Sequence, residues 1–153
     1  MSTRSKLSTL WIFATVNYIY CDLVGVMDPH LLRGFLAGNV GGIEVSPAFL
    51  LGASVLVEIP MAMILLSRLL NERTNRWANV AAGAVMTIVQ LGSLFAKAPA
   101  SYYVFFSVIE IATTAAIAWY AWTRLRVHVR AIDTDVQAVR SVGSHHVPGA
   151  SPL

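Results

Sequence analysis

The sequence predicts an all-α fold, a bundle of four transmembrane helices with a short amphipathic surface helix in the first outer loop. Of its 153 residues, 56% are hydrophobic and only 12% are charged, whereas a soluble domain usually carries about twice that charged fraction. The apolar residues form four long blocks of about 20 residues, a length that crosses a hydrocarbon core of roughly 30 Å as a helix. Because lipid offers the backbone no hydrogen-bond partners, each block should be helical.

The blocks cover residues 7–27, 48–70, 77–96 and 102–123. The first block follows a basic start, as a signal peptide does, but it is longer than a signal core and no small-x-small cleavage site follows it. We therefore expect it to remain as a helix. Residues 1–123 are predicted to form the transmembrane domain. Residues 124–153 are predicted to form a cytoplasmic tail that is helical at first and then disordered.

The outer loop after the first block is the longest. Asp28 and Pro29 are typical of a helix N-cap followed by proline at the first helical position. The apolar residues that follow have helical spacing and end at Gly38: Leu31, Leu32, Phe35 and Leu36. This pattern predicts a surface helix over 29–37, against the bundle or the membrane. The stretch NVGGIEV predicts a tight reversal, and Ser46 with Pro47 should cap the second membrane helix.

The distribution of Lys and Arg predicts the orientation. If the N-terminus is cytoplasmic, nine basic residues lie inside and only Arg33 and Lys97 lie outside. The inner set is Arg4, Lys6, Arg68, Arg73, Arg76, Arg124, Arg126, Arg130 and Arg140. This bias places both termini in the cytoplasm. The inner loop NERTNRWANV is expected to be polar, with Trp77 at the headgroup level.

Polar side chains occur inside the apolar blocks and are the candidates for function. Counted from the outer boundary, they lie between roughly 7 and 16 Å deep: Asp22, Gln90, Glu110, Asn17 and Glu58. Asn17, Tyr18 and Asp22 share one face of the first helix with Cys21, the single cysteine. Charged groups at such depth usually face the bundle interior and mark binding sites or pathways. The sequence therefore predicts a polar pocket that opens outwards.

The acids Glu58 and Glu110 fall at similar depth, which favours one shared acidic pocket. Pro60 removes an amide donor one turn from Leu56 and should kink the helix beside Glu58, which would widen the bundle there. The predicted ligand- or proton-binding residues are Glu58, Glu110, Asp22, Gln90, Asn17 and Tyr18. The alternative is structural: the acids tie helices together through hydrogen bonds to Gln90 or Asn17.

Three stretches, YIYCDLVG, NRWANV and PASYYVFFSVIEI, resemble small bacterial four-helix inner-membrane proteins of unassigned function, broadly similar to the DoxX-like group. The resemblance covers residues 7–123. It implies the four-helix topology and a location in the bacterial cytoplasmic membrane, and it implies no reaction.

Three function classes follow. The first binds or transports a small amphiphile or cation, with proton coupling as an open variant. The second is an intramembrane lipid-modifying enzyme of the isomerase kind, and the third is a non-catalytic subunit of a membrane complex. Small residues at 81–84 and Gly92 suit close helix contacts in the third case. We expect no cofactor, no metal site and no nucleic acid. The expected partners are the lipid bilayer, the ligand, and a second copy or another membrane protein.

Overall fold

The computed structural model describes residues 2–96 and 100–144, of which residues 125–144 are described as backbone only. The helices are α1 (Thr3–Met27), α2 (Pro29–Leu36), α3 (Pro47–Leu69), α4 (Glu72–Ala96) and α5 (Ser101–Ser144). Four of them are long and apolar enough to cross a membrane: α1, α3, α4 and the Ser101–Arg124 part of α5. The all-α prediction is confirmed, and the four apolar helices indicate a multi-pass membrane protein.

Two helices begin before their apolar blocks do, and in each a side-chain cap stabilises the first turn. The Ser2 hydroxyl accepts a hydrogen bond from the Ser5 amide at 3.2 Å, so α1 begins at Thr3. The Asn71 side chain accepts from the Thr74 amide at 3.0 Å, and α4 begins at Glu72. The prediction of a polar loop before Trp77 was therefore wrong. An N-cap side chain stabilises the first turn, so a helix can begin with polar residues that the hydropathy pattern alone does not assign to it.

The segment between α1 and α3 matches its prediction. Residues Pro29–Leu36 form α2, and Leu31 packs within 3.2 Å of the position where a Cβ on Gly25 would lie. Strands β1 (Asn39–Val40) and β2 (Ile43–Glu44) pair antiparallel. Two glycines with φ values of 63° and 89°, at 41 and 42, form the reversal between them, a conformation that glycine adopts without strain. Contact of α2 with the membrane stays a prediction.

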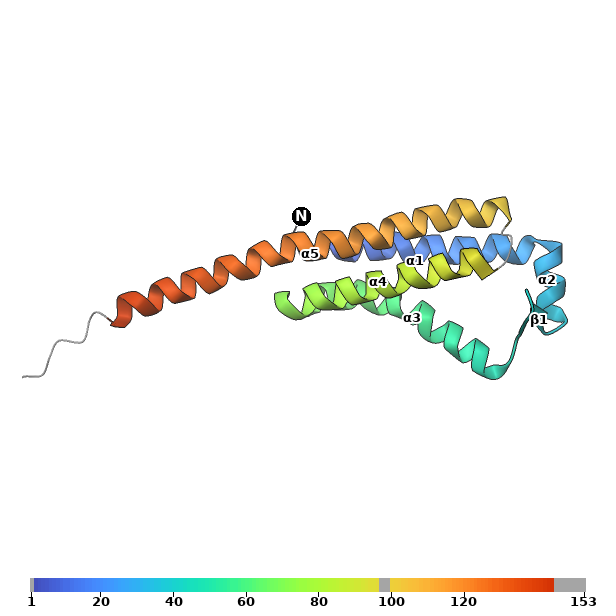
Figure 1. The fold of residues 1–153 in the computed structure, drawn as a ribbon, viewed down its shortest axis with the longest axis horizontal. Helices are drawn as coiled ribbons and strands as arrows, with labels where there is room; N and C mark the ends of the chain where they lie inside the picture. The colour runs from blue at the N-terminus through green and yellow to red at the C-terminus, as the bar shows by residue number, and fades with distance from the viewer. Residues whose placement is uncertain (1, 97–99, 145–153) are drawn as a thin grey trace, which may run out of the picture.

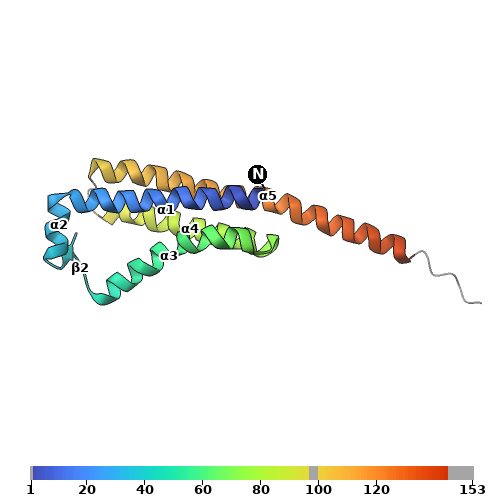
Figure 2. The same ribbon diagram turned by 180° about the vertical axis from the view of Figure 1, so that it is seen from behind.

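The four long helices run alternately up and down (Figure 1). The N-terminus, the α3–α4 turn and the far part of α5 lie at one end, while α2 and the hairpin lie at the other, as Figure 2 also shows. Helix α1 packs against α3 and α5, and α4 packs chiefly against α5. The last part of α5 extends beyond the bundle. Whether the transmembrane domain ends at residue 123 stays a prediction, and the predicted disordered end, residues 145–153, lies outside the described residues.

The apolar core lies in the half of the bundle nearest the N-terminus. Its buried residues come from all four long helices: Leu7, Trp11, Ala14, Met63, Ala82, Met86, Ile117 and Ala121. Helix α3 bends away from the others towards the α2 end (Figure 1), and every side chain from 47 to 55 is exposed. Pro60 lies inside α3, where the side chains change from exposed to buried. Because proline lacks an amide donor, it permits the bend.

Asp28 connects α1 to α2 and should make this junction sensitive to pH. Its carboxylate accepts from the His30 amide at 2.9 Å and from the Tyr102 hydroxyl at 3.4 Å. The His30 amide hydrogen bond is the main cause that holds the pKa of Asp28 below its ordinary value. A lowered folded pKa gives stabilisation that is fully present above the ordinary carboxyl pKa and is lost as the pH falls through the lowered value.

We therefore expect the α2 amides to exchange hydrogen faster, relative to intrinsic rates, as the pH falls below the ordinary range of aspartate. Asp28→Asn keeps a capping oxygen but removes the titrating group, so its α2 protection should not depend on pH in that range. Hydrogen exchange of the two chains over a pH series checks this. Equal pH dependence in both chains would show that Asp28 is not the cause.

Candidate functional site

The site is built around Glu110, on the side of α5 that faces α1. Its side chain is only 1% exposed. The Asn17 amide of α1 donates to Glu110 Oε1 at 3.1 Å and to the Phe106 carbonyl at 3.4 Å. Glu110 Oε2 is buried and has no hydrogen-bond partner among the described residues. A buried carboxyl oxygen without a donor is costly, so this atom is available to a proton or a ligand.

Tyr18 follows Asn17 in α1 and contributes a second unpaired polar atom. Its hydroxyl is buried and has no partner in the part of the chain that the structure describes. Glu110 and Tyr103 are close enough to act on it electrostatically. Cys21, one turn further along α1, lies close enough to Glu110 for a charge on that carboxyl to act on it. The structure thus brings together Asn17, Tyr18 and Glu110 at the α1–α5 contact.

Asp22 lies at the edge of this group, with an exposed side chain one turn from Tyr18 on α1. Its charge acts on both Cys21 and Glu110. A carboxylate in this position would attract a cation towards the buried acid, because the two negative charges add at short range.

Gln90 is buried but belongs to a different contact. Its amide donates to the Ser107 hydroxyl of α5 at 2.7 Å. The Tyr103 hydroxyl donates to Ser93 at 2.7 Å, and Ser93 donates to the Gln90 carbonyl at 2.8 Å. The bonds to Ser107 and from Tyr103 join α4 to α5, and the Ser93–Gln90 bond lies within α4. The Gln90 side chain therefore contributes to the α4–α5 contact, and a ligand- or proton-binding role for it stays a prediction.

Glu58 does not join Glu110, and the expectation of one shared acidic pocket was wrong. Its side chain is exposed, whereas Glu110 is buried. The residues that α3 buries are Pro60, Met63 and Ser67. At 100° per residue Glu58 lies about 140° to 180° around the helix from all three. The sequence predicts a similar depth for the two acids, but α3 presents Glu58 on the side away from the bundle.

A second polar cluster, which the sequence analysis missed, lies at the N-terminal end of the core. Trp11 Nε1 donates to Asn79 Oδ1 at 2.7 Å, and the Ser67 hydroxyl donates to the same oxygen at 3.1 Å. Asn79 Nδ2 donates to Asn75 Oδ1 at 2.6 Å, and Asn75 Nδ2 donates to the Ser67 carbonyl at 2.9 Å. All four side chains are fully buried. The four-residue spacing of Asn75 and Asn79 places both on one face of a helix, but nothing in the sequence shows that this face meets Trp11 and Ser67.

This cluster, called the asparagine cluster below, ties α1, α3 and α4 together. The donors and acceptors named above satisfy one another, in contrast with Glu110 and Tyr18. A fully satisfied buried network fixes a unique packing. We therefore interpret the asparagine cluster as structural and the Glu110 group as the candidate site.

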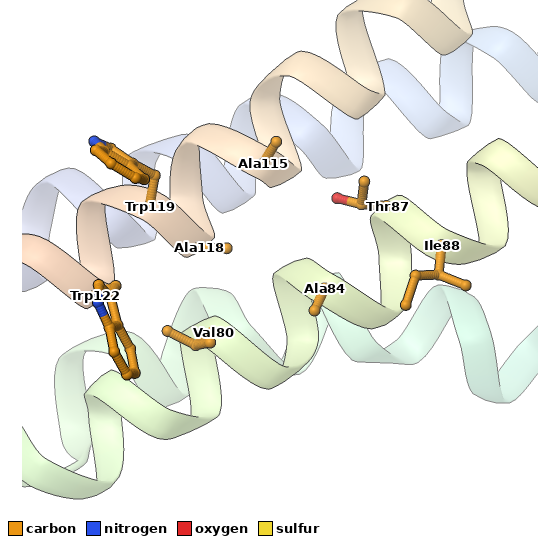
Figure 3. Close-up of a pocket in the computed structure, with 8 residues that line it drawn as sticks. All are labelled: Val80, Ala84, Thr87, Ile88, Ala115, Ala118, Trp119 and Trp122. Atoms are coloured by element: carbon orange, nitrogen blue, oxygen red, sulfur yellow. The ribbon is translucent and has the colours of Figure 1, made fainter.

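An apolar groove of about 420 Å³ lies between α4 and α5, and its lining includes no residue of the asparagine cluster or of the Glu110 group. Figure 3 shows Val80, Ala84, Thr87 and Ile88 on one side and Ala115, Ala118, Trp119 and Trp122 on the other. On α5, Ala115 and Trp119 lie about 140° and 180° around the helix from Glu110. The groove is apolar, and these two residues lie on the side of α5 away from the buried acid.

Among residues 2–95 and 100–124, whose side chains the structure describes, no three His, Cys, Asp or Glu side chains gather in a way that holds a metal ion. A family model described as a family of unknown function, DUF6326, matches residues 2–130. No curated protein and no solved structure shows a significant match. The broader resemblance to the DoxX-like group stays a prediction.

Proposed function

Because the chain belongs to the DUF6326 family of unknown function, we propose its function from its own residues: it binds a small cation or cationic amphiphile at Glu110 and carries it across a membrane. The observation that carries this proposal is the buried carboxyl of Glu110, which has one oxygen that accepts from Asn17 and one that has no partner among the described residues. A bound cation, or a proton when no cation is bound, gives that oxygen a partner. Exchange between the two would couple cation movement to a proton gradient.

The membrane setting rests on the four apolar helices and their arrangement. The α3–α4 turn, with Arg68, Arg73 and Arg76 beside it, lies at the same end as the N-terminus (Figure 1). Basic residues concentrate on the cytoplasmic side of membrane proteins. We therefore propose that both termini are cytoplasmic in a bacterial inner membrane. The Glu110 group then lies in the outer half of the bilayer, within reach of Asp22 and the outer surface.

Uptake of a fluorescent lipophilic cation into proteoliposomes, driven by an imposed proton gradient, tests the proposal. Glu110→Gln keeps the size of the side chain and an oxygen for Asn17, but it removes the negative charge and the titrating proton. We expect uptake to fall by roughly tenfold or more, since a buried charge contact is worth more than about 1.4 kcal/mol. Glu44→Gln in β2 removes an exposed acid and is the matched control. Unchanged uptake by Glu110→Gln would refute the proposal.

Tyr18→Phe separates a binding role from a packing role. Phenylalanine keeps the ring and removes a buried hydroxyl that has no partner among the described residues. We expect thermal stability to stay the same or to rise by up to about 1 kcal/mol, because an unsatisfied polar group is lost. Cation binding should nevertheless weaken severalfold. Parallel thermal melts and binding titrations of the two chains check this, and unchanged binding would restrict Tyr18 to packing.

A further inference from the structure

Glu58 lies at the middle of α3, where the hydrocarbon of a membrane offers its carboxyl no polar partner. It is 11 residues from Pro47 and 11 residues from Leu69, the two ends of the helix. At 1.5 Å per residue, either end is roughly 16 Å away, which is beyond the reach of a glutamate side chain. The side chain is exposed in the single chain. In a bilayer this carboxyl would point into hydrocarbon unless another polar group covered it.

The face of α3 that carries Glu58 has the spacing of a helix–helix contact. Its residues follow one another at intervals of four and three: Leu51, Val55, Glu58, Ala62, Leu65 and Leu69. This set is called the α3 stripe. Apart from Glu58 the α3 stripe is apolar, and Leu51, Leu65 and Leu69 are 67%, 64% and 76% exposed. Alternating steps of four and three residues place side chains on the seam between two nearly parallel helices.

Ala62 is the smallest side chain of the α3 stripe, and it lies one turn from Glu58. Small residues at the contact between two membrane helices let their backbones approach closely. A neighbouring helix can therefore come near enough at this point for a polar group on it to reach the Glu58 carboxyl.

We propose that the α3 stripe is the interface between two copies of this chain. Two copies inserted in the same direction present parallel α3 helices around a two-fold axis along the membrane normal. Glu58 of each copy then lies at the same depth as Glu58 of the other. A pair of carboxyl groups that holds at least one proton is self-complementary, because an O–H of one donates to an oxygen of the other. A second copy therefore supplies a polar partner at the required depth without any other protein.

The exposed half of α3 supports the same assignment. Within one chain, the side chains from 47 to 55 are all exposed, and a Cβ added to Gly52 would meet nothing within 4 Å. This part of α3 therefore lacks support from its own bundle. Contact with the neighbouring α3 would supply that support along the whole α3 stripe.

Disulfide cross-linking in native membranes tests the interface without changing Glu58. In a Cys21→Ala chain, Val55→Cys and Leu65→Cys lie on the α3 stripe. Ile88→Cys and Val108→Cys lie on exposed faces of α4 and α5, at 68% and 59% exposure, and serve as matched controls. A disulfide closes only when the two Cα atoms are within about 7 Å. We expect covalent dimers at both stripe positions and none above background at the controls. Equal yields at all four positions would overturn the proposal.

Co-purification of two differently tagged full-length copies tests the role of Glu58. Glu58→Leu suits lipid, so this chain should remain folded while its co-purification falls by roughly tenfold, the effect of about 1.4 kcal/mol. Glu58→Gln should keep the assembly, because two amides also donate to and accept from each other. A parent chain that is monomeric, including one captured by a different membrane protein, would overturn the proposal. So would a Glu58→Leu chain that assembles as well as the parent.

Discussion

Replacing Gly83 by leucine is expected to force α4 away from α5 and to give the largest loss of stability of any single change in the bundle. A Cβ at this position would lie 2.8 Å from the Thr114 carbonyl oxygen and 3.1 Å from the Ala118 Cβ. The first of these atoms belongs to the backbone, so the helices themselves must shift. Overpacking in a tight core costs about 1 to 3 kcal/mol. We expect the upper end or more for leucine.

Gly92→Leu is the matched control in the same helix. A Cβ at Gly92 would meet nothing within 4 Å, so this change should be neutral or slightly stabilising, because leucine favours the helix more than glycine does. Thermal unfolding of the three detergent-purified chains gives the comparison. Equal melting temperatures for Gly83→Leu and the parent chain would contradict the close α4–α5 contact.

Asn79→Ala is expected to have the second largest effect. It leaves the Trp11 indole N–H, the Ser67 hydroxyl and Asn75 Oδ1 without the Asn79 side chain as their partner, and all three residues are buried. Unpaired buried groups cost about 1 to 3 kcal/mol each in water-soluble proteins, but interhelical hydrogen bonds in membranes average closer to about 0.6 kcal/mol. The membrane value decides here: two of the lost bonds join helices and the third lies within α4, so at about this value for each the expected loss is about 2 kcal/mol.

A double-mutant cycle with Trp11→Phe isolates the interhelical bond. Phenylalanine removes the N–H that donates to Asn79, so the two changes should be non-additive by about 0.6 to 1.7 kcal/mol. The stability of Ser67→Ala can be compared with that of Ser54→Ala, a matched control in the same helix α3. Ser67 donates to Asn79, while Ser54 is exposed and donates to the Leu50 carbonyl of its own helix. Additive effects of Asn79→Ala and Trp11→Phe would contradict the asparagine cluster.

The levels of Asn17 and Glu110 relative to each other were predictable from the sequence, and the direction of Glu58 around its helix was not. Counting residues from the outer boundary put Asn17 and Glu110 at similar depth, and they meet at 3.1 Å. The same count put Glu58 level with them, yet it lies on the opposite side of α3 from Ser67. A membrane helix is apolar on every face, so its hydrophobic pattern does not tell the packed face from the lipid face. The packing of Met63 and Ser67 inside the bundle decides which face of α3 is the packed one.

The turn chemistry could be predicted because its causes are local. Asp28 with Pro29, Ser46 with Pro47, and the two glycines of the hairpin each act within a few residues. The asparagine cluster could not be predicted from the sequence, because it depends on side chains from α1, α3 and α4 that meet only in the folded bundle. Its recognition also required α4 to begin at Glu72, which a single cap at Asn71 decides.

Equilibrium binding of tetraphenylphosphonium to the purified full-length protein tests the central claim most directly, namely that the buried Glu110 carboxyl is the cation site. The parent chain and Glu44→Gln should bind the cation with equal affinity. Glu110→Gln should bind it roughly tenfold more weakly or not at all, while melting at the same temperature as the parent. Equal affinity in a folded Glu110→Gln chain would contradict the account.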